Sequence, residues 1–325
     1  MRRPFRALLA LATLTACGAP QLAAPPEVTA PPTTAEETPE QPVCTDEQAA
    51  LDATRSYAPD GPLPPPGQMP EGSTMRAIQD EGRLRVGVSA GTLQFGFLNP
   101  QSGELEGFDI AILEEVARAI FGVDDPPIEY RVMNFAERLP ALENEEVDLV
   151  AHTMTINCDR WLRIGFSSTY YDAGQKVLVP TGSGITGVQD LVSAGARVCV
   201  TSGGTAFDEM SKPEYEGVEL VAETETTDCL VAMQQGRADA VVSDDTLLVG
   251  LAAQDPNLEL VGEALTAEPY GIGVNQDNVD LVQFVNGVLE QMREDGRWTE
   301  LYQEWVGDEN AAPPPPPDAV YGREQ

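Results

Sequence analysis

Strand-like and helix-like segments alternate along residues 74–306, and this alternation constrains the fold more than any other feature of the sequence. Short β-branched runs such as residues 84–89 and 128–133 are typical of buried strands. Between these two runs, residues 108–122 carry apolar side chains at helical spacing and end in a glycine. Alternation of this kind predicts an α/β fold with mainly parallel sheets. The other expected elements are strands at 147–154, 175–180, 196–200, 218–222 and 238–243, and helices at 136–146, 205–211, 227–236, 245–253, 278–294 and 297–305.

The charge of the chain argues against several classes of partner. The sequence has 53 acidic and 19 basic residues among 325, a formal net charge of −34. This charge opposes binding to nucleic acid, and it opposes binding to an anionic membrane by charge alone. The length favours two domains, and the apolar content of 42 % is ordinary for a globular protein.

The first residues have the pattern of an export signal. A basic MRRPFR segment precedes an apolar segment that is too short to span a membrane. Residues 14–17 (LTAC) then resemble the lipobox of bacterial lipoproteins, in which Cys17 would carry the lipid after cleavage. We therefore expect residues 1–17 to be a lipoprotein signal peptide and the mature protein to be anchored to the outer face of the cell membrane. An ordinary signal peptide with a chance cysteine is the alternative. No later segment has the length and apolarity of a membrane-spanning helix.

Two proline-rich segments flank the α/β region. Residues 18–75 are expected to be a tether with a short structured segment around Cys44, and residues 307–325 a disordered proline-rich tail.

Four cysteines remain after Cys17, and an extracytoplasmic location allows them to form disulfides. Cys199 lies in a strand-like segment and Cys229 opens a helix-like segment 30 residues later, so we predict a Cys199–Cys229 bond. A Cys44–Cys158 bond follows by elimination, and free buried thiols are the alternative. The sequence has no Cys-x-x-Cys motif and no pair of histidines, so no metal site is expected.

Four segments, taken in order, carry a resemblance to a known family: 103–117, 147–179, 197–205 and 234–245, supported by 285–307. Together they resemble the extracytoplasmic solute-binding proteins of family 3, the two-lobed receptors of ABC importers for polar amino acids, and the likeness covers nearly all of residues 76–306. The resemblance implies a type II periplasmic-binding-protein fold and a monomer. Lobe 1 would comprise residues 76–177 plus 272–306, and lobe 2 residues 181–265. Hinge strands near 176–180 and 268–274 would join the lobes around a ligand cleft.

The resemblance also implies a site for a free amino acid, whose carboxylate and ammonium both need charged partners when buried. Arg160 follows the T-x-T-I-x-x-x-R pattern and would bind the α-carboxylate bidentately. Thr155 would donate to the same carboxylate, and Thr153 would accept from the ammonium. The alternative for Arg160 is a surface ion pair with Asp159.

Lobe 2 would complete this site. Gly203 and Gly204 allow a close approach of the backbone to the ligand, and Thr205 would contact the α-carboxylate at the start of a helix. Asp244 matches the aspartate that holds the α-ammonium in the family. Helix capping is the alternative at both places, and Asp245 could provide the second cap.

Side-chain specificity rests on fewer residues. Ser89 is neutral at a position where the family often has an acid, which weakens the case for a basic ligand or glutamine. Arg138 lies where receptors for acidic amino acids often carry an arginine, so it would pair with a distal carboxylate; an ion pair with an exposed acid is the alternative. Phe135 or Phe95 would pack on the ligand, Gln175 is a weaker candidate, and core packing is the alternative for both phenylalanines.

The only histidine, His152, lies next to the expected cleft, and a structural role is favoured over a role in binding an acidic side chain.

We expect no cofactor and no catalysis. The expected function is capture of glutamate or aspartate for an ABC permease. A sensor subunit for a kinase-linked membrane partner is the first alternative, and a dehydratase on the same fold is the second, although no acid/base pair is evident for it.

Overall fold

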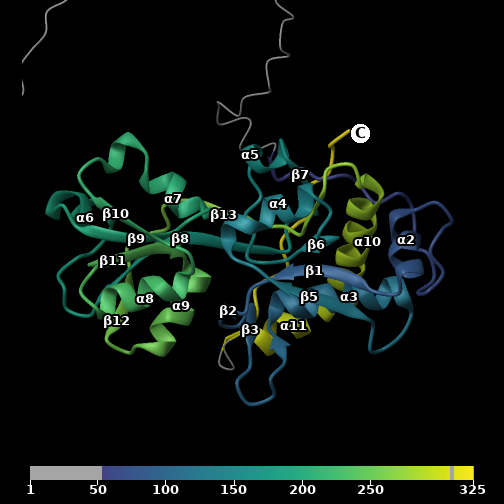
Figure 1. The fold of residues 1–325 in the computed structure, drawn as a ribbon, viewed down its shortest axis with the longest axis horizontal. Coiled ribbons are helices and arrows are strands. Elements are labelled where there is room, and N and C mark those ends of the chain that lie inside the picture. The colour runs from purple at the N-terminus through teal and green to yellow at the C-terminus, as the bar shows by residue number, and fades with distance from the viewer. Residues whose placement is uncertain (1–52, 308–310, 325) are drawn as a thin grey trace, which may run out of the picture. The chain divides into compact units, whose positions relative to one another are not determined.

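The computed structural model describes residues 53–307 and 311–324. Figure 1 draws these residues as a coloured ribbon. The expected signal peptide, Cys17, Cys44 and the first part of the tether lie outside the described residues. Within the described ranges, no helix combines the length and the hydropathy needed to cross a bilayer.

Lobe 1 is built on a five-stranded mixed sheet. Its strand order is β5-β1-β6-β14-β7, in which β1 runs parallel to β5 and β6 while β14 runs antiparallel to β6 and β7. Leu84, Val86 and Val88 of β1 are fully buried, as the β-branched run predicts. The elements of this lobe are α2 (Thr74–Glu81), β1 (Leu84–Val88), β2 (Gly91–Thr92), β3 (Gly96–Leu98), β4 (Leu105–Glu106), α3 (Phe108–Phe121), β5 (Ile128–Val132), a 3₁₀ turn (Phe135–Glu137), α4 (Arg138–Glu143), β6 (Leu149–Val150), α5 (Cys158–Trp161), β7 (Ile164–Phe166), β14 (Gly273–Asn275), α10 (Val279–Asp295) and α11 (Arg297–Trp305).

Lobe 2 is built on a second mixed sheet in the order β10-β9-β11-β8-β12. The first three strands are parallel, and β8 is antiparallel to β11 and β12. Its elements are β8 (Tyr171–Pro180), α6 (Val188–Ala194), β9 (Arg197–Thr201), α7 (Thr205–Met210), a 3₁₀ turn (Pro213–Tyr215), β10 (Glu219–Glu223), α8 (Thr226–Gln234), β11 (Ala240–Asp244), α9 (Asp245–Gln254) and β12 (Leu258–Val261). The predicted two-lobed α/β fold is confirmed, but its sheets are mixed instead of mainly parallel because β8 and β14 enter them in the reverse direction.

The predicted disulfide between Cys199 and Cys229 is confirmed. It joins β9 to α8 with the two Cα atoms 5.5 Å apart, and both residues are fully buried. Closing a loop of 30 residues in the unfolded chain corresponds to about 3–4 kcal/mol of stabilisation. Cys158 is also disulfide-bonded, and its expected partner lies outside the described residues.

Two adjacent strands connect the lobes. β13 (Ala267–Tyr270) pairs with the first half of β8, from Ala267 opposite Gly174 to Tyr270 opposite Tyr171. Figure 1 shows β8 running from this crossing into the lobe that carries β9 and β11. The hinge expected at 176–180 lies several residues earlier, because residues 175–180 already pair with β11 and β12 in lobe 2.

Residues 53–75, expected to belong to the tether, are packed onto lobe 1. Ser56, Met69 and Met75 are buried, and the Ser56 hydroxyl donates to the carbonyl of Phe166 at 2.7 Å. The proline-rich composition predicted an unpacked tether because it gives no weight to single apolar side chains. Burial of Met69 and Met75 against lobe 1 stabilises this segment.

Residues 311–324, expected to be a disordered tail, also lie on lobe 1. Tyr321 forms an isolated parallel bridge with Ser56, whose amide donates to the carbonyl of Val320 at 2.9 Å. The Nε atom of Arg293 donates to the carbonyl of Pro317 at 3.0 Å. Proline-rich chains stay extended without internal hydrogen bonds, so their carbonyl groups remain available for contacts of this kind.

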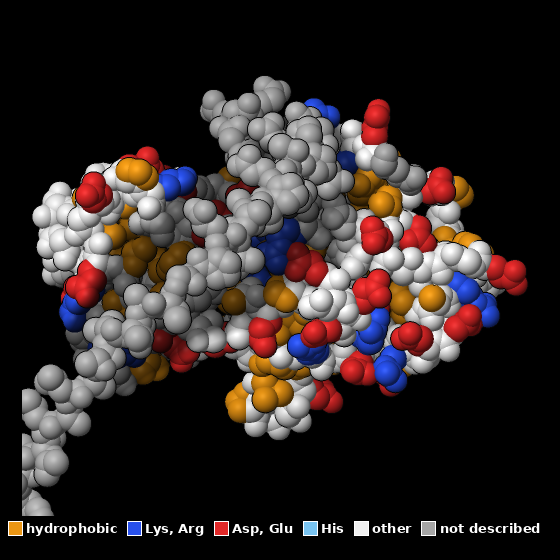
Figure 2. All heavy atoms as spheres, turned by 45° about the horizontal axis from the view of Figure 1, so that its top comes forward, with side chains coloured by type: hydrophobic (Ala, Val, Ile, Leu, Met, Phe, Trp, Pro, Cys, Tyr) orange, Lys and Arg blue, Asp and Glu red, His pale blue; other side chains and the backbone are white. Residues whose placement is uncertain are grey.

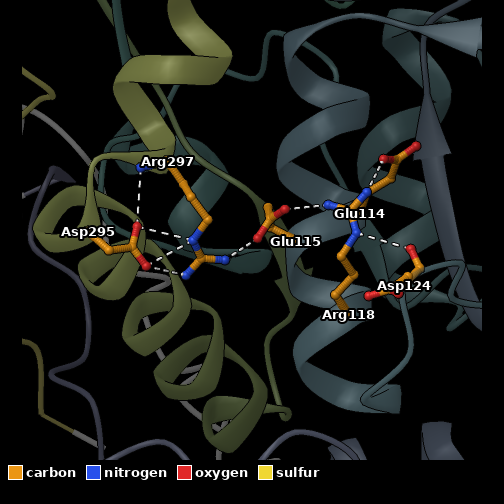
Figure 3. Close-up of polar contacts among 6 residues, drawn as sticks. All are labelled: Glu114, Glu115, Arg118, Asp124, Asp295 and Arg297. Carbon is orange, nitrogen blue, oxygen red and sulfur yellow. Dashed lines mark hydrogen bonds and ion pairs between the residues drawn. The ribbon is translucent and has the colours of Figure 1, made fainter.

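A charged network fixes the last helices of lobe 1 (Figure 3). Arg297, at the start of α11, forms an ion pair with Asp295 at 2.8 Å and a second ion pair with Glu115 of α3. Arg118 pairs with the same Glu115 and with Glu114. Elsewhere, Figure 2 shows acidic side chains spread over the visible face with basic side chains between them, a surface in which isolated pairs add little stability.

Candidate functional site

A small polar cavity lies between the two lobes. Its volume is about 10 Å³, roughly the space of one water molecule, so an amino acid can enter only if the surrounding groups move apart. The lining residues are Phe135, Arg138, Thr153, Thr155 and Arg160 from lobe 1, and Thr201, Gly204, Thr205, Ala206, Ser243 and Asp244 from lobe 2. Larger hollows exist, such as one of about 270 Å³ between the proline-rich segment and α10, but that hollow has no buried unpaired cation in its lining.

Arg160 reaches the cavity from α5. The short helix is capped by Asn157, whose side-chain oxygen accepts from the amide of Arg160 at 2.9 Å. Arg160 is 6 % exposed, and its Nη1 atom donates to the carbonyl of Thr155 at 2.6 Å. Burial lowers the pKa of the guanidinium, while the nearby carboxylates of Glu268 and Asp244 oppose that change. The alternative pairing with Asp159 is not observed.

Arg138 lies in the same cavity and is 1 % exposed. Its three nitrogens donate to backbone carbonyls: Nε to Phe135 at 3.0 Å, Nη1 to His152 at 2.9 Å, and Nη2 to Gly203 of lobe 2 at 3.1 Å. The guanidinium also stacks 4.3 Å from the Phe135 ring. Burial, and then the charge of Arg160, lower its pKa. Among the described residues, neither arginine forms an ion pair with a carboxylate, so two buried cations are available to an anion.

Asp244 provides a negative charge on the lobe 2 side. It stands at the start of α9, but its side chain does not cap the helix; Oδ2 accepts from the Tyr270 hydroxyl at 2.7 Å. Burial and the neighbouring Glu268 raise the pKa of Asp244 to about 7. The neighbouring Asp245 instead accepts from the amide of Thr246 at 2.9 Å. Asp244 therefore keeps one oxygen for a further donor.

Glu268, on β13, was missed by the sequence analysis. Its Oε2 atom accepts from the hydroxyls of Thr155 at 2.6 Å and Thr205 at 2.8 Å, and Oε1 accepts from Gln175 at 3.0 Å and Thr266 at 2.6 Å. The carboxylate is 3 % exposed. The hydroxyls of Thr155 and Thr205, which were predicted to bind a ligand carboxylate, thus donate to a carboxylate of the protein itself.

Thr153 has an unusual backbone, with φ at +43°, a region that few residues with side chains adopt. Its amide donates to Oδ2 of Asp109 at 2.8 Å, and the other oxygen of Asp109 accepts from the Tyr170 hydroxyl at 2.6 Å. Burial raises the pKa of Asp109 to about 6. The Thr153 hydroxyl is buried without a hydrogen-bond partner, so it is available to a ligand.

Gly203 of lobe 2 lies against the backbone of lobe 1. Its φ is +78°, and a Cβ atom there would lie 2.8 Å from the Cα atom of Ala136. Its carbonyl accepts from Arg138 and, at 3.5 Å, from Arg160. Only glycine satisfies both the backbone angle and the contact.

Three other candidates do not line the cavity. Ser89 bonds to the Thr92 hydroxyl and to the amides of its own turn. Phe95 is fully buried among the rings of Phe108, Tyr171 and Tyr270. Gln175 donates to Thr205 and Glu268 behind the cavity.

His152 is fully buried against Phe135, with its Nε2 atom 2.9 Å from the carbonyl of Met133. Burial, and then the charge of Arg138, lower the pKa of His152 to about 3. The imidazole is therefore neutral at physiological pH, which agrees with the structural role and not with a protonated donor to a ligand.

The cavity lining contains three further residues that the sequence did not indicate: Thr201, Ala206 and Ser243. Thr201 and Ser243 lie near the ends of the neighbouring strands β9 and β11. Their place at strand ends is the sequence signal that would have identified them as binding-site candidates. Glu268 and Asp109 carried no local signal, because an acid in a strand segment or at the start of a helix is unremarkable.

Two α/β lobes joined by paired hinge strands, with a charged cavity between them, define a solute-binding receptor of the periplasmic type. The sequence profile of the bacterial extracellular solute-binding proteins, family 3, matches residues 84–308. The chain belongs to this family.

Individual relatives match a similar share of this chain. The chain is 35 % identical over 238 residues to the ABC transporter glutamine-binding protein GlnH of Bacillus subtilis, spanning 73 % of this chain and 86 % of that protein. It is 30 % identical over 253 residues to the glutamate-binding protein GluB of Corynebacterium glutamicum, spanning 75 % and 85 %. The solved arginine-binding protein ArgBP of T. maritima (P235GK mutant) is 32 % identical, with a TM-score of 0.67 over 72 % of this chain and 99 % of that one. The relatives are amino-acid-binding proteins, and the family is extracellular.

Proposed function

We propose that this chain is a lipid-anchored extracytoplasmic receptor that binds glutamate or aspartate and delivers it to an ABC permease. The observation that carries the proposal is the pair of buried guanidiniums, Arg138 and Arg160, which share one cavity with Asp244 and form no ion pair with any carboxylate in residues 53–307 and 311–324. A buried cation without a counter-ion is costly, and a ligand with two carboxylates would remove that cost for both arginines.

The ligand's backbone groups would be bound by three residues. Arg160 would hold the α-carboxylate bidentately, since a planar guanidinium matches the two oxygens. Asp244 would accept from the α-ammonium through the oxygen that Tyr270 does not use, and the unpartnered Thr153 hydroxyl would accept a second bond. For Thr155 and Thr205 to bind the same carboxylate, their hydroxyls would have to leave Glu268.

The ligand's side chain would be read by Arg138 and Phe135. Arg138 has N–H groups that its three carbonyl bonds do not use, and these would pair with the distal carboxylate. The methylene groups would pack against the Phe135 ring, which lines the cavity. Function in this account is closure around the ligand, with no bond made or broken.

Glutamine is a second candidate, and two relatives favour it: the Bacillus subtilis protein and a Geobacillus stearothermophilus protein, 37 % identical over 201 residues, are both glutamine-binding proteins. An amide oxygen would also accept from Arg138. The two candidates differ in how strongly Arg138 contributes, because a charged hydrogen bond is stronger than a neutral one.

Isothermal titration of the mature protein with glutamate, aspartate, glutamine and asparagine tests the proposal. We expect the acidic ligands to bind more tightly, and Arg138→Ala to weaken them far more than the amides. Arg163→Ala, which removes an exposed arginine paired with Glu143, is the control and should change nothing. Failure of all four amino acids to bind would refute the receptor assignment, and equal losses for acids and amides in Arg138→Ala would refute the acidic specificity.

A further inference from the structure

The helix that carries Arg160 is too short to be stable by itself. α5 has four residues, whereas isolated helices in water need roughly 12–15 to be even marginally populated. The position of Arg160 therefore depends on what its neighbours contact. Trp161, the next residue, is the large buried side chain of this helix, with 7 % exposure.

Trp161 packs on the Phe166 ring of lobe 1, with the ring centroids 5.6 Å apart, and it also contacts both ends of the described chain. Its indole N–H donates to the carbonyl of Ala53 at 2.6 Å, and the Tyr57 ring packs edge-on at 6.1 Å. From the other end, the guanidinium of Arg323 lies 3.7 Å from the indole ring. A cation at this distance over tryptophan is a favourable contact. Residues from both flanking segments thus contact the side chain that follows Arg160.

The two ends also bind each other. The amide of Ser56 donates to the carbonyl of Val320 at 2.9 Å, and the amide of Arg323 donates to the carbonyl of Ser56 at 3.2 Å. The Ser56 hydroxyl in turn donates to Phe166 of β7 and accepts from Asn286 of α10 at 2.8 Å. The paired ends are therefore attached to the lobe 1 framework and are not a separate appendage.

We propose that residues 53–57 and 320–323, here called the terminal clasp, position the ligand-binding Arg160 by holding Trp161. Both segments lie outside residues 84–308, the region that matches the family. The clasp is therefore an addition by which this chain orders a turn of the shared site. The effect on ligand affinity rests on the proposed function, whereas the effect on the turn itself does not.

The first test needs no ligand. Hydrogen exchange, followed by mass spectrometry on peptides covering residues 158–166, compares the full mature chain with Arg323→Ala and with a chain that ends at residue 310. Both variants should exchange several-fold faster in this peptide, because loss of the clasp lowers the cost of local opening. Arg323→Lys retains a cation over the indole and should restore protection, and Glu324→Ala, an exposed neighbour, should match the parent chain. Unchanged exchange in both variants would overturn the proposal.

The second test separates positioning from general stability. Below the melting transition, Arg323→Ala should weaken binding roughly fivefold, the size of a lost cation–π contact. The loss should be equal for glutamate and glutamine, because Arg160 binds the group they share, whereas Arg138→Ala discriminates between them. Affinity unchanged in a folded Arg323→Ala protein would contradict positioning. A parent chain that binds no amino acid would refute the proposed function and leave the exchange result to decide on the clasp.

Discussion

At the scale of single residues, the cavity is defined by charges that are individually costly to bury. Arg138 and Arg160 bring positive charge, and Asp244 and Glu268 bring negative charge, all at 6 % exposure or less. Each is held by hydrogen bonds, yet within the described part of the chain the guanidiniums donate to backbone carbonyl oxygens and not to the acids. The arrangement keeps opposite charges close without pairing them, so a zwitterion that enters when the surrounding groups move apart could pair with both.

Replacement of Arg160 by lysine tests the bidentate contact. A lysine keeps the charge but not the planar fork, so Arg160→Lys should weaken every amino acid ligand by roughly 10- to 100-fold, irrespective of its side chain. Titration calorimetry measures the change, with Arg163→Lys as the surface control. Loss confined to acidic ligands would show that Arg160 reads the side chain instead.

The pH dependence of binding follows from Asp244. Its pKa is about 7 in the empty protein, raised by burial and by Glu268 and opposed by Tyr270, Arg160 and Arg138, so below pH 7 it is increasingly protonated. Only the ionised form attracts an ammonium, and affinity should therefore rise as the pH rises through 7 and then level off. Asp244→Asn should abolish the step, whereas Asp245→Asn should preserve it. The free energy of unfolding depends on pH in the opposite direction. Because the pKa of Asp244 is raised in the folded protein, the stability that Asp244 contributes is present at acidic pH and is lost as the pH rises through 7.

At the scale of elements, the site is assembled from the ends of strands and the turns that follow them. Thr201 and Asp244 end β9 and β11, which are adjacent parallel strands, so the chain delivers lobe 2 groups to one edge of the sheet. The glycine turn after β9 then brings the carbonyl of Gly203 against both arginines of lobe 1.

Substitution of Gly203 tests whether this turn limits closure. A methyl group would meet the backbone of Ala136 at 2.8 Å, so Gly203→Ala should hold the lobes apart and weaken ligand binding by about tenfold or more. Gly182 has nearly the same φ, +77°, but open space around it, so Gly182→Ala isolates the backbone strain from the contact. Calorimetric titration measures the affinity of both variants. If Gly203→Ala binds the ligand as tightly as Gly182→Ala does, the turn does not limit closure.

At the scale of the whole two-lobed body, Glu268 links the parts that move. It lies on a hinge strand and accepts from Thr155 of lobe 1 and Thr205 of lobe 2. A carboxylate with donors on both sides favours the closed arrangement even before a ligand contributes, and a ligand then shifts the same equilibrium further.

Removal of the Glu268 carboxylate should open the empty receptor. We expect the ligand-free Glu268→Ala protein to have a larger radius of gyration than the parent chain in small-angle X-ray scattering, and saturating amino acid to reduce the difference. Glu263→Ala is the control, because this acid lies on the surface of lobe 2 and not at the hinge. Identical scattering of the two ligand-free proteins would show that Glu268 does not bias closure.

The sequence alone determined the features that depend on local spacing. Alternating periodicity predicted the α/β elements, and the spacing of a strand and a helix predicted the Cys199–Cys229 bond, because each is set by residues that are near in the chain. The resemblance to the solute-binding family, carried by the order and spacing of its motifs, implied that Arg160 and Asp244 would share one cleft, and both residues line the cavity.

Only the tertiary structure decided the features that join distant residues. Glu268 meets Thr155 across 113 positions, and Asp109 meets Thr153 across 44. Ser56 pairs with Val320, although the sequence predicted a tether with a short structured segment for the region of Ser56 and a disordered tail for that of Val320. Periodicity and composition describe a residue's own surroundings along the chain, whereas hydrogen bonds of this kind exist only once folding has brought two remote backbones within about 3 Å of each other.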